Sequence, residues 1–138
     1  MVLSKSYVVD TPNIVRYLER INQKYLENYF ALIEFIYNNE SVEFIVVVTP
    51  WMVKNMPNWR IIESIESIKN VRIKYSVDYD LDPDISLFEI LKEIDNSFII
   101  SNDKFRNGKY LQYKFEIGNR INFELIEESN KIILRCDL

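Results

Sequence analysis

Histidine is absent from this sequence of 138 residues, and cysteine occurs once, at Cys136. Without histidine, these residues cannot form a Ser-His-Asp triad, a histidine-based acid–base pair or a Cys/His zinc site. A single cysteine also excludes a disulfide within the chain, since a disulfide joins two cysteines. Any chemistry must therefore come from carboxylates, hydroxyls, lysines or a bound metal ion.

Long hydrophobic runs are missing as well. The longest candidate, over residues 44–48, has the length of a strand, far below the ~18 residues needed to span a bilayer. The first five residues lack the basic stretch and apolar core of a secretory signal. A length of 138 residues with 48% hydrophobic content fits one ordinary domain. We therefore expect a single domain over residues 1–138, a cytoplasmic location and no contact with membranes.

Positive charge is outnumbered, with 17 Lys and Arg against 21 Asp and Glu and a net charge of −4. This balance argues mildly against a surface that holds nucleic acid by charge alone. It is compatible with a small acidic site that binds metal ions, because the ions bring positive charge with them.

Strand-like and helix-like segments alternate along the chain, without repeats or Pro/Gly/Ser-rich linkers. Short runs rich in β-branched and other apolar residues predict strands, and apolar residues at helical spacing predict helices. The expected strands cover residues 6–10, 42–49, 71–75 and 97–101, and the expected helices cover residues 13–37, 61–68 and 84–94.

The other segments carry weaker signals. Residues 51–58, marked by two prolines, and the acidic segment 76–83 are expected to be loops. A helix is expected somewhere within 103–118, and the alternating segments 121–126 and 131–136 are expected to pair through a short turn. The order of the main elements predicts an α/β fold with a mainly parallel sheet and helices on both faces.

Aspartates follow two of the expected buried strands and open one of the helices. Asp10 ends the first strand, Asp103 follows the fourth, and Asp84 begins the third helix. In open parallel sheets, active sites lie beyond the carboxyl ends of the strands. Clustered carboxylates repel one another, and a hard cation such as Mg²⁺ or Mn²⁺ relieves that repulsion. Such a site suits phosphodiester hydrolysis without histidine.

Each of these acids also has a purely structural interpretation. Asp10 and Asp103 could cap the helices that follow them through backbone N–H groups. Asp84 could simply favour the positive end of its helix. Trp51 could pack against the protein instead of stacking on a base. The residues alone leave these alternatives open.

Two segments resemble the NYN/PIN-like ribonuclease superfamily. Residues 7–13, YVVDTPN, are similar to its opening strand, which ends in D-x-x-N, and residues 97–107, SFIISNDKFRN, are similar to its S-N-D strand end followed by an aromatic residue and an arginine. Pro50-Trp51 and Asp82-Pro83-Asp84 match two further elements in the same order. The greatest similarity is to the catalytic domain of regnase-type, CCCH-zinc-finger ribonucleases.

The resemblance implies a three-layer α/β/α PIN-like (Rossmann-like) sandwich with a mainly parallel central sheet. It also implies a Mg²⁺- or Mn²⁺-dependent endoribonuclease that cuts single-stranded RNA, and a homodimer is plausible. Asp10, Asp84, Asp103 and Asn13 would be catalytic. The metal would be held by Asp10, Asp82, Asp84, Asp103 and Asn107. RNA would be bound by Asn102, Lys104 and Arg106.

Three departures from the family pattern bear on activity. Pro83 splits the adjacent acidic pair, and Asn107 stands where the family has a further aspartate. The basic, glycine-rich loop of the regnase type is shortened here. These departures support an alternative function, a catalytically degenerate PIN-like domain that acts as an RNA-binding or protein-interaction scaffold.

Overall fold

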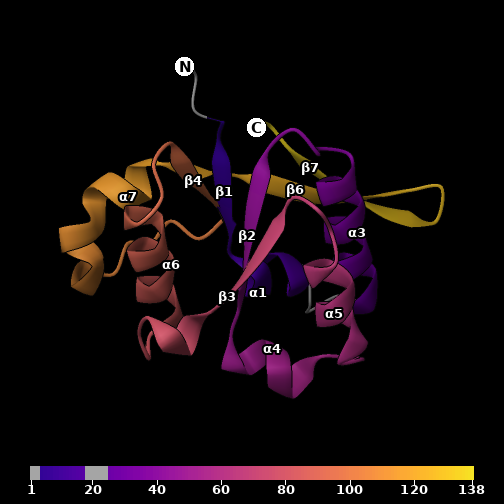
Figure 1. Ribbon diagram of the computed structural model, residues 1–138, viewed down its shortest axis with the longest axis horizontal. Helices are drawn as coiled ribbons and strands as arrows, with labels where there is room; N and C mark the ends of the chain where they lie inside the picture. The colour runs from indigo at the N-terminus through magenta and orange to yellow at the C-terminus, as the bar shows by residue number, and fades with distance from the viewer. Residues whose placement is uncertain (1–3, 18–24) are drawn as a thin grey trace.

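The computed structural model describes residues 4–17 and 25–138, and Figure 1 shows how their helices and strands are arranged. Strands and helices alternate up to the C-terminal hairpin. In chain order the elements are β1 (Ser6–Val9), α1 (Thr11–Val15), α3 (Tyr25–Tyr37), β2 (Glu43–Val48), α4 (Pro50–Asn55), α5 (Arg60–Glu66), β3 (Val71–Tyr75), the 3₁₀ helix η1 (Ser76–Asp78), α6 (Pro83–Lys92), β4 (Ser97–Ile100), the 3₁₀ helix η2 (Gly108–Tyr113), α7 (Lys114–Gly118), β5 (Arg120–Ile121), β6 (Phe123–Glu128) and β7 (Lys131–Cys136).

Five parallel strands form the central sheet, in the order β3-β2-β1-β4-β5. β1 lies in the middle, with Tyr7 level with Phe44 of β2 and Phe98 of β4. All four residues of β1 are buried, as expected for a strand that is covered on both faces. Because the strands are parallel, their carboxyl ends meet at one edge of the sheet.

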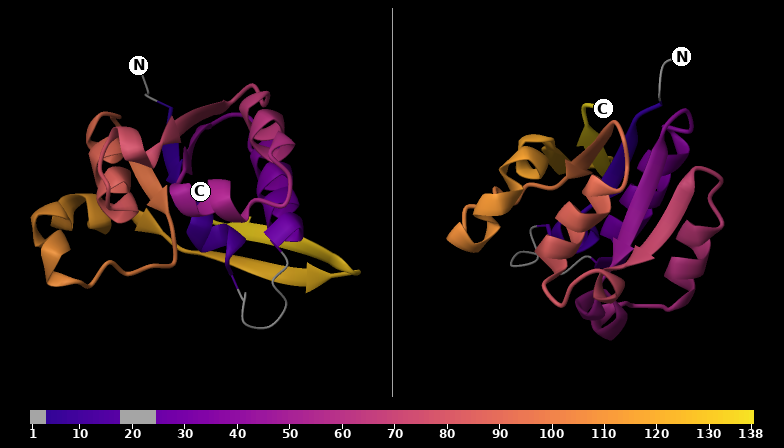
Figure 2. Two further views of the ribbon diagram at one scale, coloured as in Figure 1. Left: turned by 90° about the horizontal axis from the view of Figure 1, so that it is seen from below. Right: turned by 60° about the vertical axis from the view of Figure 1, so that its left-hand side comes forward.

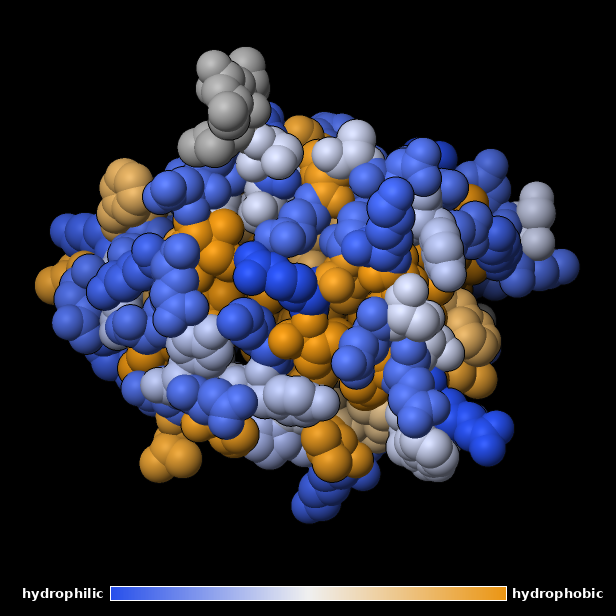
Figure 3. Space-filling model, viewed as in Figure 1, coloured by the Kyte–Doolittle hydropathy of each residue, from blue (hydrophilic) through white to orange (hydrophobic). Residues whose placement is uncertain are grey.

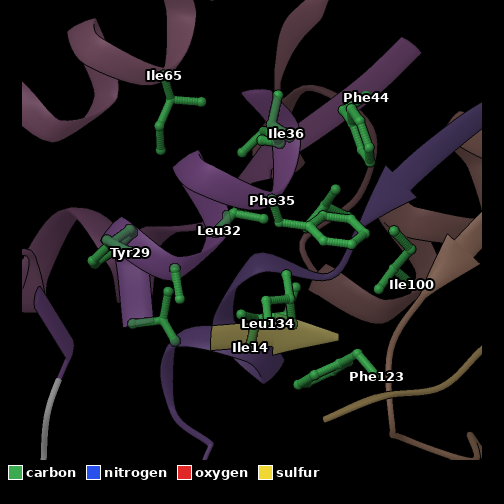
Figure 4. Packing of buried hydrophobic residues seen from close by; sticks show 14 of the residues in the cluster. Ile14, Tyr29, Leu32, Phe35, Ile36, Phe44, Ile65, Ile100, Phe123 and Leu134 are labelled. Carbon is green, nitrogen blue, oxygen red and sulfur yellow. The ribbon is translucent and has the colours of Figure 1, made fainter. Parts of the chain in front are cut away.

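Helices cover both faces of this sheet, which confirms the expected three-layer α/β/α architecture (Figure 2). Tyr7 and Val9 of β1 face a core built with α1, α3, α5 and the β6–β7 hairpin. Figure 4 shows other side chains of this core from close by, among them Ile14, Phe44 and Leu134. Val8 faces the other way, into a second core formed by α6 and η2. Hydrophilic residues cover much of the face seen in Figure 3, with hydrophobic residues visible between them. None of the described helices is long and apolar enough to cross a membrane.

The expected loop at 51–58 is wrong over residues 51–55, because helix α4 occupies Pro50–Asn55, whereas residues 56–58 belong to no helix or strand. Thr49 caps this helix, its hydroxyl accepting from the backbone N–H of Met52 at 3.4 Å. Pro50 occupies the first turn, where a proline costs no hydrogen bond. The proline that suggested a loop is therefore a helix-start signal.

The expected helix over 13–37 is also wrong as one continuous element. α1 begins earlier, at Thr11, and ends at Val15, and α3 begins at Tyr25. Residues 18–24 of the expected helix lie outside the described part of the chain. The amide of Asn28 in α3 donates to the backbone oxygens of Val15 at 2.7 Å and Tyr17 at 3.4 Å, which stabilises the end of α1.

The C-terminal third of the chain confirms the expected pairing of two strands and contains one further strand, β5. β6 and β7 are antiparallel, with Phe123 level with Cys136. The expected strand 121–126 is interrupted at Asn122, because Ile121 belongs to β5 and pairs with β4 in the main sheet. The segment 103–118 contains η2 and α7.

Candidate active site

Asp10 lies directly after β1 and is buried, with 8% of its surface exposed. It precedes α1 without forming a side-chain capping hydrogen bond, although the backbone N–H of Asn13 in that helix lies close enough to lower the pKa of its carboxyl. The carboxylate instead accepts a hydrogen bond from the hydroxyl of Ser101 at 2.6 Å. The strand pairing that brings β1 beside β4 therefore also joins the two side chains that follow these strands.

The segment after β4 is held by a chain of hydrogen bonds. The backbone N–H of Asn102 donates to the side-chain oxygen of Asn13 at 2.8 Å, which ties α1 to the end of β4. The amide of Asn102 forms two bonds of 2.9 Å with the backbone of Phe123. The N–H of Asp103 donates to the Ser101 hydroxyl at 3.1 Å, and its carboxylate accepts from the N–H of Phe105 at 2.8 Å. Asp103 thus orders its own loop and is not the cap of a helix.

At the start of α6, the two aspartates beside Pro83 have different roles. Asp82, not Asp84, caps the helix, and it accepts from the backbone N–H groups of Asp84 and Ile85. The carboxylate of Asp84 is therefore available to the site, where the hydroxyl of Tyr110 donates to it at 2.8 Å. Asp82 pairs with Lys109 at 2.9 Å and accepts more weakly from Tyr110 at 3.3 Å.

The three acids described above line one open pocket, which has a volume of about 390 Å³. Asp10, Asp84 and Asp103 line it together, and we call it the acid pocket. Asn13 and Asn102, two further residues expected at the site, also line it. The other lining residues are Pro12, Arg16 and Tyr17.

Four residues expected at the site are absent from the lining of the acid pocket. Asp82 is engaged by Lys109 and by the start of α6. Asn107 is exposed and caps η2, accepting from the N–H of Lys109 at 3.1 Å. Lys104 and Arg106 are exposed in the loop between β4 and η2.

Burial and mutual repulsion raise the pKa of two acids in the pocket. The pKa of Asp10 is raised to about 7, mainly by burial and further by the negative charges of Asp84 and Asp103, while the Ser101 hydrogen bond opposes the rise. Burial and the charges of Asp103 and Asp82 also raise the pKa of Asp84, against the hydrogen bond from Tyr110. For Asp82, burial is outweighed by Lys109 and by the backbone N–H groups, so its pKa is lowered. The pocket therefore contains unsatisfied negative charge, which a cation would stabilise.

The donor set of the acid pocket fits a hard, hydrated cation. Its lining offers carboxylate and amide oxygens, the ligand type that Mg²⁺ and Mn²⁺ prefer. Within residues 4–17 and 25–138, no three acidic or cysteine side chains converge closely enough to hold an ion together. Mg²⁺ commonly keeps several waters and takes only one or two carboxylates directly, so this spacing suits an ion that reaches the remaining acids through water.

Sequence reasoning missed Ser101, Tyr110 and Arg16 as site residues. Ser101 was visible only as part of the S-N-D motif. Tyr110 meets Asp84 from 26 residues away, through the packing of η2 on α6, and no local pattern indicates that contact. Arg16 does carry a signal, since it lies three residues after Asn13 and hence on the same side of the first helical turns.

Replacing Tyr110 with phenylalanine is expected to weaken the site more at low pH than at high pH. The change removes the hydrogen bond that lowers the pKa of Asp84, so this acid stays protonated to higher pH and competes less well for a cation. We expect the dissociation constant for Mn²⁺, measured by calorimetric titration, to rise about tenfold at pH 6 and less at pH 8.

The control for this variant is Tyr113→Phe. Tyr113 packs on the same ring of Phe88, but its hydroxyl donates to Glu89, outside the acid pocket. An equal change in both variants at both pH values would show that Tyr110 has no specific effect on Asp84.

Comparison with known proteins supports the fold. No protein-family model matches the chain, and no curated protein is similar to it in sequence. The structure is similar to Arabidopsis thaliana nuclear protein-only RNase P 2 (PRORP2), with a TM-score of 0.59 and 12% identity, over 97% of this chain and 30% of that one. It also aligns with the PIN domain endonuclease Utp24, with a TM-score of 0.42 and 13% identity, over 96% of this chain and 92% of that one.

The fold assignment depends on the first match, since the second has a TM-score below 0.5. The chain spans about 30% of the length of the RNase P protein. An all-parallel sheet of five strands between two helical layers agrees with the expectation drawn from residues 7–13 and 97–107. The chain therefore shares the fold of the part of the RNase P protein that it matches, a five-stranded parallel sheet between two layers of helices.

Proposed function

We propose that this chain is a Mg²⁺- or Mn²⁺-dependent endoribonuclease that hydrolyses phosphodiester bonds of single-stranded RNA. The observation that supports this most is the acid pocket, which Asp10, Asp84 and Asp103 line together at the carboxyl edge of the sheet. None of the three caps a helix through its side chain. Their shared location is therefore not explained by helix capping.

In this proposal Asp10, Asp84 and Asp103 hold the cation, directly or through water, and Asp82 and Asn107 take part only through water. A bound divalent ion polarises a phosphoryl oxygen and lowers the pKa of a water molecule. The protein's own part is positioning. Ser101 orients the Asp10 carboxylate, Tyr110 orients Asp84, and Asn13 fixes the start of the loop that carries Asp103.

RNA would approach the pocket from the side of the exposed loop between β4 and η2. Lys104 and Arg106 are exposed there and would contact the phosphate backbone. The side chain of Asn102 already forms two hydrogen bonds with the backbone of Phe123. It would therefore contact RNA only through its second amide hydrogen and the second lone pair of its oxygen. The proposal also includes a single nuclease domain over residues 1–138, a homodimer and a cytoplasmic location. It further includes a particular similarity to regnase-type enzymes.

The direct test compares Asp103→Asn with the wild type. We expect cleavage of a fluorescent single-stranded RNA in Mn²⁺ to fall by about 100-fold or more, because a charge that supports the cation is lost while the shape is kept. RNA affinity should change less than about threefold, since the other RNA contacts are kept. Asp78→Asn is the matched control, an exposed acid outside the acid pocket. Cleavage by Asp103→Asn at the wild-type rate would contradict the assignment.

A non-catalytic scaffold is the second candidate. Two of the five expected metal ligands support it, because Asp82 is paired with Lys109 and Asn107 caps η2. This alternative predicts RNA or protein binding without cleavage in Mg²⁺ or Mn²⁺, and binding that is unchanged in Asp103→Asn.

A further inference from the structure

Lys109, at the start of η2, brings a positive charge to the acids that flank Pro83. Its ammonium lies 2.9 Å from a carboxylate oxygen of Asp82 and 5.0 Å from the centre of the Tyr110 ring. Its backbone N–H donates to the side-chain oxygen of Asn107 at 3.1 Å. An ion pair in full contact with water contributes little, but only 21% of the Asp82 side chain is exposed. These contacts together hold the ammonium beside Asp82.

Both carboxylate oxygens of Asp82 are already engaged within the protein. Oδ1 accepts from the backbone N–H groups of Asp84 at 2.9 Å and Ile85 at 3.5 Å. Oδ2 accepts from the ammonium of Lys109 at 2.9 Å and from the hydroxyl of Tyr110 at 3.3 Å. A divalent ion could therefore bind Asp82 directly only by displacing Lys109 or by breaking the cap of α6.

The influence of Lys109 extends to Asp84, which lines the acid pocket. The hydroxyl of Tyr110 lies between the two acids and donates to Asp84 at 2.8 Å. Burial raises the pKa of Asp84, and the charge of Lys109 opposes that rise. Neighbouring carboxylates need positive charge between them, and in nucleases with two metal ions the second ion provides it. Here a lysine of the chain itself has that place.

We propose that Lys109 takes the place of a second divalent ion, so that the acid pocket binds a single Mg²⁺ or Mn²⁺. The single ion is held from the side of Asp10 and Asp103, and the ammonium keeps Asp82 and Tyr110 in position on the other side of Asp84. The inference rests on the proposed function for the identity of the ion, and it adds the number of ions and the residue that sets it.

A second group of the same three side-chain types provides a matched control. Lys92 lies 3.7 Å from a carboxylate oxygen of Glu89 and 4.7 Å from the centre of the Tyr113 ring, and the Tyr113 hydroxyl donates to Glu89 at 2.6 Å. These three residues lie outside the acid pocket. If loss of any lysine paired in this way opened a metal site, Lys92 and Lys109 would be equivalent. The proposal predicts that only Lys109 sets the number of ions.

The experiment counts the ions bound, by calorimetric titration of Mn²⁺ into the metal-free protein. The wild type should bind one ion. Lys109→Met, which keeps the length of the side chain without its charge, should bind a second ion with a dissociation constant about ten- to 100-fold higher than that of the first. Lys109→Arg and Lys92→Met should each bind one ion, as the wild type does. Circular dichroism checks that each variant is folded.

The proposal is overturned if the wild type binds two ions or none, if Lys109→Met still binds one, or if Lys92→Met also gains one. Because counting ions needs no catalysis, failure of the proposed function can be distinguished. A wild type that binds one ion but never cleaves RNA, with a second ion in Lys109→Met, would refute the nuclease proposal and support the role of Lys109. A wild type that cleaves RNA and binds two ions would do the reverse.

Discussion

Asp10→Asn is expected to reduce RNA cleavage by about 1,000-fold or more while making the metal-free protein more stable at pH 8. In the proposed function, the loss of activity follows from removing a buried carboxylate that lines the acid pocket, since a bound cation contributes several kcal/mol to such reactions. The gain in stability follows from the same burial, because a neutral amide of the same shape does not pay for a buried charge.

The sign of the stability change depends on pH. The pKa of Asp10 is about 7 in the folded protein, whereas the same side chain titrates near 3.8 when unperturbed. Below pH 4 the carboxyl is protonated in both states and costs nothing. As the pH rises to 7, only the unfolded state ionises readily, so the folded wild type loses stability. Above pH 7 the loss is complete, on the order of a few kcal/mol.

Urea unfolding in EDTA at pH 4 and pH 8 measures this difference. The free energies of unfolding of the wild type and Asp10→Asn should be similar at pH 4, and the variant should be the more stable at pH 8. Asp78→Asn, at an exposed position, should show no such pH-dependent gain. A variant that is less stable than the wild type at pH 8 would mean that Asp10 is not a strained buried charge.

Phe88→Ala is expected to cost about 3–5 kcal/mol of folding free energy. Phe88 is fully buried in α6, and its ring contacts those of Phe105 at 5.0 Å, Tyr113 at 4.9 Å and Tyr110 at 5.5 Å. These contacts hold the loop after β4 and the 3₁₀ helix η2 against α6. Phe105 also has a left-handed backbone, with φ of 49°, a conformation that needs such support outside glycine.

Urea unfolding at pH 7 measures this cost, with Phe115→Ala as the control. Phe115 is 81% exposed, so its removal should change stability by less than about 0.5 kcal/mol. Phe88→Leu keeps most of the buried volume and should remain folded, with a smaller loss of stability. It should still raise the Mn²⁺ requirement for cleavage, because Tyr110 loses an aromatic neighbour and orients Asp84 less well. Equal stability of Phe88→Ala and the wild type would contradict this packing.

The strands were the most predictable part of the fold. Residues 45–48 form a continuous β-branched run, and such a run has few stable options other than a strand buried on both faces. α4 was missed because its proline was taken as a loop marker, although Thr49 and Pro50 together form a helix start. The break after α1 depends on Asn28, a tertiary contact 13 residues away from Val15.

The candidate site was predictable as far as it depends on strand ends. Asp10 and Asp103 follow paired parallel strands, so the order of the elements places them at one edge of the sheet. The different roles of Asp82 and Asp84 were not predictable, because either acid could cap α6 until the backbone direction after Pro83 is known. Tyr110 and Lys109 reach these acids only through the packing of η2.

The central claim is that the acid pocket binds a divalent cation, and calorimetric titration of Mn²⁺ into the metal-free protein tests it most directly. The wild type should show saturable binding at pH 7.5, and Asp10→Asn should show none at the same concentrations, while remaining folded. Equal Mn²⁺ binding by both proteins would contradict the claim, because the ion would then be held without the carboxylate on which the site is built.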